Sequence, residues 1–192
     1  YPDQELYATI VSAVSPLSLA YFFTGDETYA RHAAKLIRTW FLDPEKGMNP
    51  NLQFSQAVPG RSDGRGPGVL DGRHTAVVID AVGIMSGSKA WTTADDAAMR
   101  AWFGKYVTWL TESENGCDES NAPNNHGTWY DAHVVPAALY AGRVDIAQRI
   151  VREAAAKRVM AQIEPDGSQP KELARTRSFH YSMFNLEAHL RL

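Results

Sequence analysis

Apolar residues recur three and four positions apart along most of the chain, which is the spacing of one face of an α-helix. Residues 5–23 are apolar on every side, which predicts a buried helix that Pro16 kinks or divides. No segment alternates in the way of a β-strand. The pattern predicts helices over residues 5–23, 29–41, 73–85, 92–111, 126–140 and 145–163, with a last helix from about Glu172.

Two segments interrupt the helical spacing. Residues 47–72 are rich in glycine and proline and carry Arg61, Asp63 and Arg65. A loop of this length inside a compact domain is more often functional than idle. Residues 114–125 are polar, and we expect them to form a second loop that leads into the helix at His126.

Two stretches of the chain resemble each other. Residues 20–31 and 139–148 each show the end of a helix, a glycine-centred turn and the start of another helix. Repeated helical hairpins are typical of an α-solenoid or of an α/α toroid. Uneven spacing and long connecting loops argue against a plain solenoid. The predicted fold class is therefore all-α, an incomplete α/α toroid (barrel) of antiparallel helical hairpins.

Length and composition set limits on this picture. At 192 residues the chain is expected to form one domain, residues 1–192. It begins at Tyr1 without a methionine and ends within an apolar, helix-like run, so we expect it to be a piece of a longer protein. No stretch approaches 18 consecutive apolar residues, so we expect no membrane insertion. Cys117 is the only cysteine, which excludes an internal disulfide.

The formal net charge of −3 argues against nucleic acid as a partner, because broad nucleic-acid surfaces usually carry a basic excess. A few arginines in a cleft can nevertheless bind an anion on an acidic protein. The sequence makes no prediction about the oligomeric state.

One polar cluster lies where a loop meets a predicted helix. Asn124, Asn125 and His126 place two amides and an imidazole at a helix N-terminus, where donors attract an anion. The simpler interpretation is helix capping, for which asparagine is among the best residues.

A second cluster follows near the C-terminus. If residues 172–181 are helical, Arg177 and Tyr181 share a face and Arg175 points elsewhere. If the segment before Phe179 is irregular, either arginine can lie beside Tyr181. The simpler interpretation is an exposed basic turn with a packed tyrosine.

Taken together and in this order, the clusters resemble the signature motifs of the alginate lyase family. Asn124–Asn125–His126 followed by Trp129 is similar to the first motif. The run from Arg175 to Tyr181, followed by Asn185 and Leu186, is similar to the second, and the loop over residues 56–74 also resembles members of the group. The resemblance implies an α/α toroid that cleaves an anionic polysaccharide, needs no cofactor or metal, and acts in the periplasm or as a secreted protein.

The resemblance also implies roles for individual residues. Asn125 and His126 match the pair that neutralises the substrate carboxylate, Tyr181 matches the catalytic tyrosine, and Arg175 matches the assisting arginine. Here the arginine and the tyrosine are one position closer than in the best-known branch, so Arg175 and Arg177 both stay candidates and the substrate can differ. The expected substrate-binding residues are Gln56, Arg73, His74, Trp129 and Arg177.

These residue types suit β-elimination from a 4-linked uronic acid. The C5 proton is very weakly acidic while the adjacent carboxylate is charged, so Asn125 and His126 would neutralise that carboxylate by donating hydrogen bonds. A tyrosine with its ordinary pKa of about 10 is a poor base at neutral pH, but a nearby arginine favours the phenolate. Tyr181 could then take the proton and return one to the leaving oxygen, and His126 is an alternative base when the two lie on opposite faces.

Three rival interpretations stay open. A glycoside hydrolase would need two carboxylates about 5 to 10 Å apart, and a non-catalytic glycan-binding helical domain would use the aromatic residues and arginines of the loops. A metal site could use His126 and His133, seven positions apart, although lone histidines at such spacing usually pack or hydrogen-bond. The carboxylates available to a hydrolase are Asp131, Glu164, Asp166 and Glu172.

Overall fold

The structure is a computed structural model that describes residues 2–192. Within this range the chain is helical, and its only β-type pairing is one isolated bridge between Val58 and Ser62. The elements follow in the order α1 (Pro2–Thr24), α2 (Glu27–Ile37), η1 (Arg38–Leu42), η2 (Gly66–His74), α3 (Thr75–Ile84), α4 (Thr93–Glu112), α5 (Glu114–Ser120), α6 (Asn125–Tyr140), α7 (Val144–Ala154), η3 (Ala155–Val159), α8 (Met160–Gln162), α9 (Pro170–Leu173) and α10 (Ser178–Arg191).

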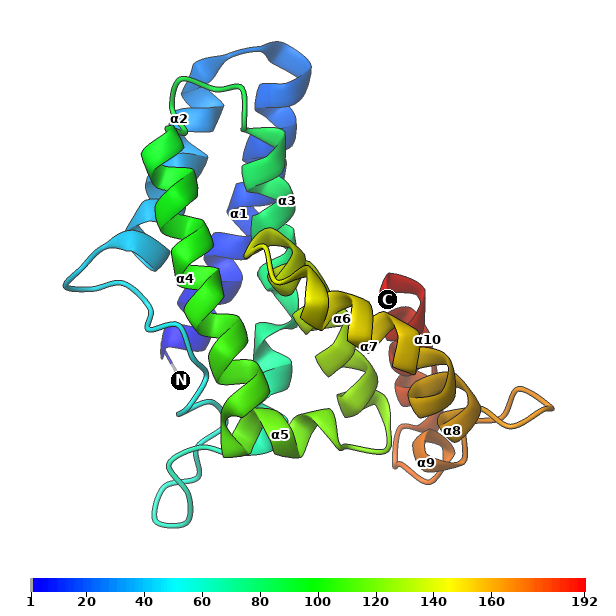
Figure 1. Ribbon diagram of the computed structural model, residues 1–192. Helices are drawn as coiled ribbons and strands as arrows, with labels where there is room; N and C mark the ends of the chain where they lie inside the picture. The colour runs from blue at the N-terminus through cyan, green and yellow to red at the C-terminus, as the bar shows by residue number, and fades with distance from the viewer. Residues whose placement is uncertain (1) are drawn as a thin grey trace.

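Helical hairpins are the repeated unit, as the sequence predicts. The turn between α1 and α2 uses Gly25 at φ 70°, and the turn between α6 and α7 uses Gly142 at φ 78°. Both values lie in the left-handed region, which glycine adopts without steric cost. In Figure 1, α1 to α4 stand side by side on one side of the molecule, and α6 to α10 form the other side, with α5 between them.

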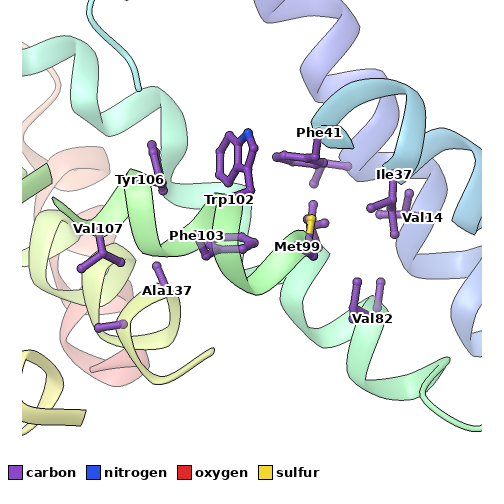
Figure 2. Close-up of a cluster of buried hydrophobic side chains, with 14 of the residues drawn as sticks. Val14, Ile37, Phe41, Val82, Met99, Trp102, Phe103, Tyr106, Val107 and Ala137 are labelled. Carbon is purple, nitrogen blue, oxygen red and sulfur yellow. The ribbon is translucent and has the colours of Figure 1, made fainter. Parts of the chain in front are cut away.

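The main core lies between α1, α2, α3 and α4 and extends to α6 (Figure 2). Its centre is an aromatic group in which Phe41 contacts Trp102 edge-on at 4.9 Å between ring centroids, and Trp102 contacts Tyr106 at 5.0 Å. Edge-to-face and tilted contacts of this kind add to the gain from burying the rings. A capping box at Thr92 and Asp95 begins α4 and sets the register of these aromatic residues.

A second, smaller apolar cluster joins α6 to α10. Trp129, Ala132 and Ala188 are buried in it, and Phe184 packs against it. The ring of Trp129 packs at a tilt against that of Phe184, with 4.9 Å between centroids, and its indole N–H donates to the Phe184 carbonyl at 3.1 Å. This cluster fixes α10 against α6.

Helix boundaries differ from the sequence prediction in three places. Pro16 does not divide α1, which continues through it from Pro2 to Thr24, and Val14 and Ser18 on either side of the proline are fully buried. The predicted polar loop over residues 114–125 contains α5, which Ser113 caps by accepting a hydrogen bond from the Gly116 amide at 3.1 Å. The long loop over residues 47–72 ends in the 3₁₀-helix η2, so α3 begins at Thr75.

Two of the C-terminal helices are also broken. The predicted helix over residues 145–163 passes through a π-helical turn, η3, before α8. The helix expected from Glu172 is two helices, α9 and α10, separated by residues 174–177. Pro170 begins α9, and a short turn follows in which the Arg175 amide donates to the Glu172 carbonyl at 3.0 Å.

The expectation that no stretch could span a membrane needs correction for α1. Over Asp3–Thr24 this helix is long and apolar enough to cross a membrane, by length and composition alone. The criterion of 18 consecutive apolar residues misses α1, because small polar residues interrupt its apolar run without greatly lowering its mean hydropathy. The predicted burial of this helix is wrong: only its inner face, with Val11 and Val14, packs in the main core, whereas Phe22 and Phe23 are exposed.

Candidate active site

The first turn of α6 presents the Asn–His pair. Asn124 caps the helix, and its side-chain oxygen accepts from the His126 amide at 3.2 Å. Asn125 has no exposed surface. Its backbone N–H and its Nδ2 donate to the two carboxylate oxygens of Glu172, at 2.6 and 2.8 Å. The capping expected from the sequence therefore holds for Asn124, while Asn125 binds a buried carboxylate.

His126 is held by a second buried carboxylate. Its Nδ1 lies 2.7 Å from Oε1 of Glu119, the side chain of which is 2% exposed. The His126 side chain is 19% exposed, and its Nε2 makes no hydrogen bond within residues 2–192. The imidazole thus has one ring nitrogen anchored inward and the other left for a ligand.

The segment between α9 and α10 brings an arginine onto a tyrosine. The Arg175 guanidinium carbon lies 4.0 Å from the centroid of the Tyr181 ring. This contact is possible because residues 174–177 are not helical, which is the irregular alternative considered from the sequence. Arg177 is exposed, and its carbonyl accepts from the Tyr181 amide at 3.0 Å at the start of α10. The cation beside Tyr181 is Arg175.

The two clusters lie at the same end of neighbouring helices. Helices α6 and α10 run in the same direction, because Trp129 pairs with Phe184 and, one turn further on, Ala132 packs with Ala188. One turn earlier these helices carry the Asn125 turn and Tyr181. Glu172 completes the link, since its carboxylate holds Asn125 and its carbonyl accepts from the Arg175 amide.

A buried polar network keeps the two helices in register. The Oε1 atom of Gln162 accepts from Thr128 at 2.9 Å and from Asn185 at 3.0 Å. Asn185 also donates to Gln169 at 2.8 Å, and Gln162 donates to the Asn124 carbonyl at 3.3 Å. These hydrogen bonds tie α6, α8 and α10 together, while the Asn185 Oδ1 is buried without a partner within residues 2–192.

The end of η2 supplies further positive charge near α10. The Arg73 guanidinium carbon lies 5.6 Å from the centroid of Phe184, and burial lowers the pKa of Arg73 from its ordinary value. His74 is exposed, yet partial desolvation lowers its pKa, and the positive charges of Arg73 and Arg191 lower it further. Neither residue is hydrogen-bonded to the Asn–His pair, and both lie close enough to α10 to interact with the charges of Glu187 and Arg191.

The remaining predicted residues lie elsewhere. Trp129 is only 4% exposed, so it packs between α6 and α10 instead of forming a surface. Gln56, at φ 52°, donates to Asp71 at 3.1 Å and accepts from Arg65 at 3.0 Å. It lines a cavity of about 500 Å³ between the start of α1 and the loop over residues 46–57, together with Tyr7. The Asn–His and Arg–Tyr residues do not line this cavity.

Sequence reasoning missed the residue that holds the loop before α6. Arg158 is 1% exposed and forms two hydrogen bonds to the carboxylate of Asp131, at 2.6 and 3.0 Å. It also donates to the carbonyls of Ser120 at 2.8 Å and Ala122 at 3.2 Å. The π-helical turn η3 directs this side chain inward, and such turns often occur at functional sites.

The carboxylates considered for a hydrolase are engaged or distant. Asp131 is paired with Arg158, and Glu172 is bonded to Asn125. Glu164 and Asp166 lie in an exposed turn. No two of these carboxylates therefore face each other freely, as a hydrolase requires.

The histidines considered for a metal site have other partners. His133 is buried, and its Nε2 lies 3.0 Å from the Tyr106 hydroxyl, while His126 is bonded to Glu119. Desolvation, with smaller effects from His74 and Arg73, lowers the pKa of His133 to about 3. Within residues 2–192 no three His, Cys, Asp or Glu side chains group in a way that could hold a metal ion.

Comparisons with known proteins identify the family and the fold. The family model described as alginate lyase matches residues 1–192. The crystal structure of an alginate lyase from Bacteroides ovatus is similar with a TM-score of 0.95 and 42% sequence identity over 98% of this chain. The chain spans 50% of the length of that structure, and no curated protein matches it.

The helical hairpins and their shared end define an all-α protein of the incomplete α/α toroid class, and this predicted fold class is confirmed. The chain belongs to the alginate lyase family.

Proposed function

We propose that the protein is a polysaccharide lyase that cleaves a 4-linked uronic-acid polymer, alginate or a related polyuronate, by β-elimination. The observation that carries the proposal is the link that Glu172 makes between the first turn of α6, which carries His126, and the segment that places Arg175 over Tyr181. An acid–base group, a cation and an anion-binding turn are the three parts that the reaction requires.

The surroundings suit an anionic polymer in spite of the chain's net negative charge. Arg175 and His180 both contact the Tyr181 ring, whereas the buried carboxylates Glu119 and Glu172 are occupied by hydrogen bonds. Local positive potential attracts a polyanion even on an acidic protein. Arg73 adds positive charge over Phe184, about one helical turn from Tyr181.

In the proposed reaction, donors first neutralise the carboxylate of the sugar that reacts. His126 is the member of the Asn–His pair that reaches the surface, through Nε2. Asn125 keeps a second Nδ2 hydrogen beyond the one given to Glu172, but its burial means that it meets substrate only after a local rearrangement of this turn. A preorganised donor aimed at developing charge is typically worth about 3 to 4 kcal/mol.

Proton transfer follows. Tyr181, with the Arg175 guanidinium over its ring, takes the C5 proton in its deprotonated form; the bond from C4 to the glycosidic oxygen breaks, and a C4–C5 double bond forms. The phenol then returns a proton to the leaving oxygen when both lie on the same face of the sugar. When they lie on opposite faces, His126 is the base and Tyr181 the acid. We also propose a periplasmic or secreted location, because such a polymer is too large to cross a membrane before it is cut.

A substrate panel tests the proposal. The whole polypeptide would be incubated with polymannuronate, polyguluronate, a glucuronate polymer and a neutral glucan, and both ultraviolet absorbance and new reducing ends would be measured. A lyase forms one absorbing double bond for every new reducing end on a uronate polymer and leaves the glucan intact. Reducing ends without absorbance would identify a hydrolase, and binding without either product would indicate a glycan-binding domain.

A further inference from the structure

Glu119 is a buried carboxylate that the proposed reaction does not use directly. Its side chain is 2% exposed at the end of α5, and its Oε1 lies 2.7 Å from Nδ1 of His126. A buried carboxylate without a partner is strongly disfavoured, so this contact determines how the His126 ring is held.

The contact has a direct consequence for the two ring nitrogens. An ionised carboxylate can only accept hydrogen bonds, so the proton of a neutral His126 resides on Nδ1. Nε2, the nitrogen without a partner within residues 2–192, then carries a free lone pair.

Charged residues also lie on the helices next to Glu119 and His126. Asp118 precedes Glu119 on α5 and lies against Gly66 of η2, and Asp131 follows on α6 but is paired with Arg158 of η3. Glu172 of α9 is held by Asn125, and Arg175 follows in the next turn. Because Asp131 is bonded to Arg158 and Glu172 to Asn125, Glu119 is the carboxylate that contacts the His126 imidazole. The groups considered are Asp118, Glu119, Asp131, Arg158, Glu172, Arg175 and, from η2, Arg73 and His74.

We propose that Glu119 is a positioning residue, which fixes the Nδ1–H form of His126 so that Nε2 faces the substrate carboxylate or the C5 proton. The proposal rests on the proposed function for its catalytic meaning, but the tautomer of His126 can be measured without any turnover. It goes beyond the Asn–His and Arg–Tyr motifs, because no motif includes Glu119.

The first test is ¹⁵N nuclear magnetic resonance of the histidine side chains in the whole polypeptide, which reports the protonated ring nitrogen. The His126 signals are assigned by their loss in His126→Gln. We expect the Nδ1–H form in the wild type and in Glu119→Gln, in which the amide oxygen can still accept the bond. We expect a shift toward the Nε2–H form in Glu119→Ala. Finding the Nε2–H form in the wild type overturns the proposal.

The second test is the turnover of a polyuronate by variants of the whole polypeptide. Glu119→Gln keeps an acceptor for the Nδ1–H of His126, so its kcat should stay closer to the wild-type value than that of Glu119→Ala. Glu119→Ala should lose about 100-fold in kcat, the lower end of what an acid–base group contributes.

A matched control separates positioning from a general effect of charge or folding. Glu114→Ala removes a carboxylate from an exposed position of the same helix and should leave both the His126 tautomer and kcat as in the wild type. A wild-type tautomer and kcat in Glu119→Ala, with a folded protein by circular dichroism, overturn the proposal. If the wild type gives no product on any polyuronate, the proposed function fails while the tautomer measurement still decides the role of Glu119.

Discussion

The buried arginine of η3 gives the sharpest test of how the site is held. Arg158 makes two hydrogen bonds to Asp131 and two more to the carbonyls of Ser120 and Ala122, and it is 1% exposed. The carbonyls belong to the turn that leads into the Asn–His pair. Replacing Arg158 with methionine keeps most of the side-chain volume and removes all four bonds.

The expected cost follows from what the substitution leaves behind. Asp131 is 3% exposed, and removing one partner of a buried ion pair typically costs about 3 to 5 kcal/mol. That is a large part of the total stability of a domain, about 5 to 15 kcal/mol. Removing both charges, in Arg158→Met with Asp131→Leu, avoids the unpaired carboxylate. The double variant should therefore be more stable than Arg158→Met by about 1 to 3 kcal/mol.

Urea unfolding followed by circular dichroism measures the free energies of unfolding of the wild type, Arg158→Met and the double variant. Arg152→Met is the matched control, because Arg152 is exposed on α7 and should change stability by less than about 0.5 kcal/mol. If the free energy of unfolding of Arg158→Met lies within about 1 kcal/mol of the wild-type value, the Arg158–Asp131 pair does not stabilise the turn before α6. A double variant less stable than Arg158→Met would equally refute the reasoning.

Three further predictions concern pH and the site. The folded-state pKa of His133, about 3, lies below its ordinary value of 6.5, so the wild type should lose stability as pH falls from 6.5 toward 3, by up to about 1.4 kcal/mol per pH unit. His133→Gln should lack this part of the loss in urea titrations, and equal slopes would exclude it. The Arg38 guanidinium, with hydrogen bonds from Thr92, holds the pKa of Asp95 well below its ordinary 3.8, so Asp95→Asn should cost about 1 to 2 kcal/mol at neutral pH. The cost is modest because Arg38 is 39% exposed. It should vanish as the pH falls below 3.8. A difference in stability between Asp95→Asn and the wild type that persists in acid would contradict the role given to the Asp95 carboxylate. Arg175→Gln should lower kcat at least about 10-fold, because it removes the cation over the catalytic ring, whereas the exposed control Arg177→Gln should change kcat less than about 2-fold; the reverse order in initial-rate assays would exchange their roles.

Local sequence signals predict much of this fold. Helical spacing locates the long helices, and the glycines at positions 25 and 142 mark both hairpin turns. The signals fail where tertiary contacts decide the outcome. Ser113 turns a polar stretch into α5, and burial of Val14 and Ser18 keeps α1 whole around a proline.

The sequence likewise predicts only part of the candidate site. The side chains that would meet substrate stand in recognisable motifs, so the sequence points to His126 and Tyr181. The groups that hold these side chains belong to no recognisable motif, because Glu172 lies 47 positions from Asn125 and Arg158 lies 27 positions from Asp131. The choice between Arg175 and Arg177 also needed the structure, since it depends on the break between α9 and α10.

The central claim is that the phenol at the start of α10 and the imidazole at the start of α6 act on one sugar ring. The most direct measurement is the rate at which the double-bond absorbance appears on a polyuronate with the whole polypeptide, compared with Tyr181→Phe and the exposed control Tyr29→Phe. The account predicts that Tyr181→Phe falls to the background rate with an unchanged circular dichroism spectrum, while Tyr29→Phe keeps the wild-type rate. Full activity in Tyr181→Phe would contradict it.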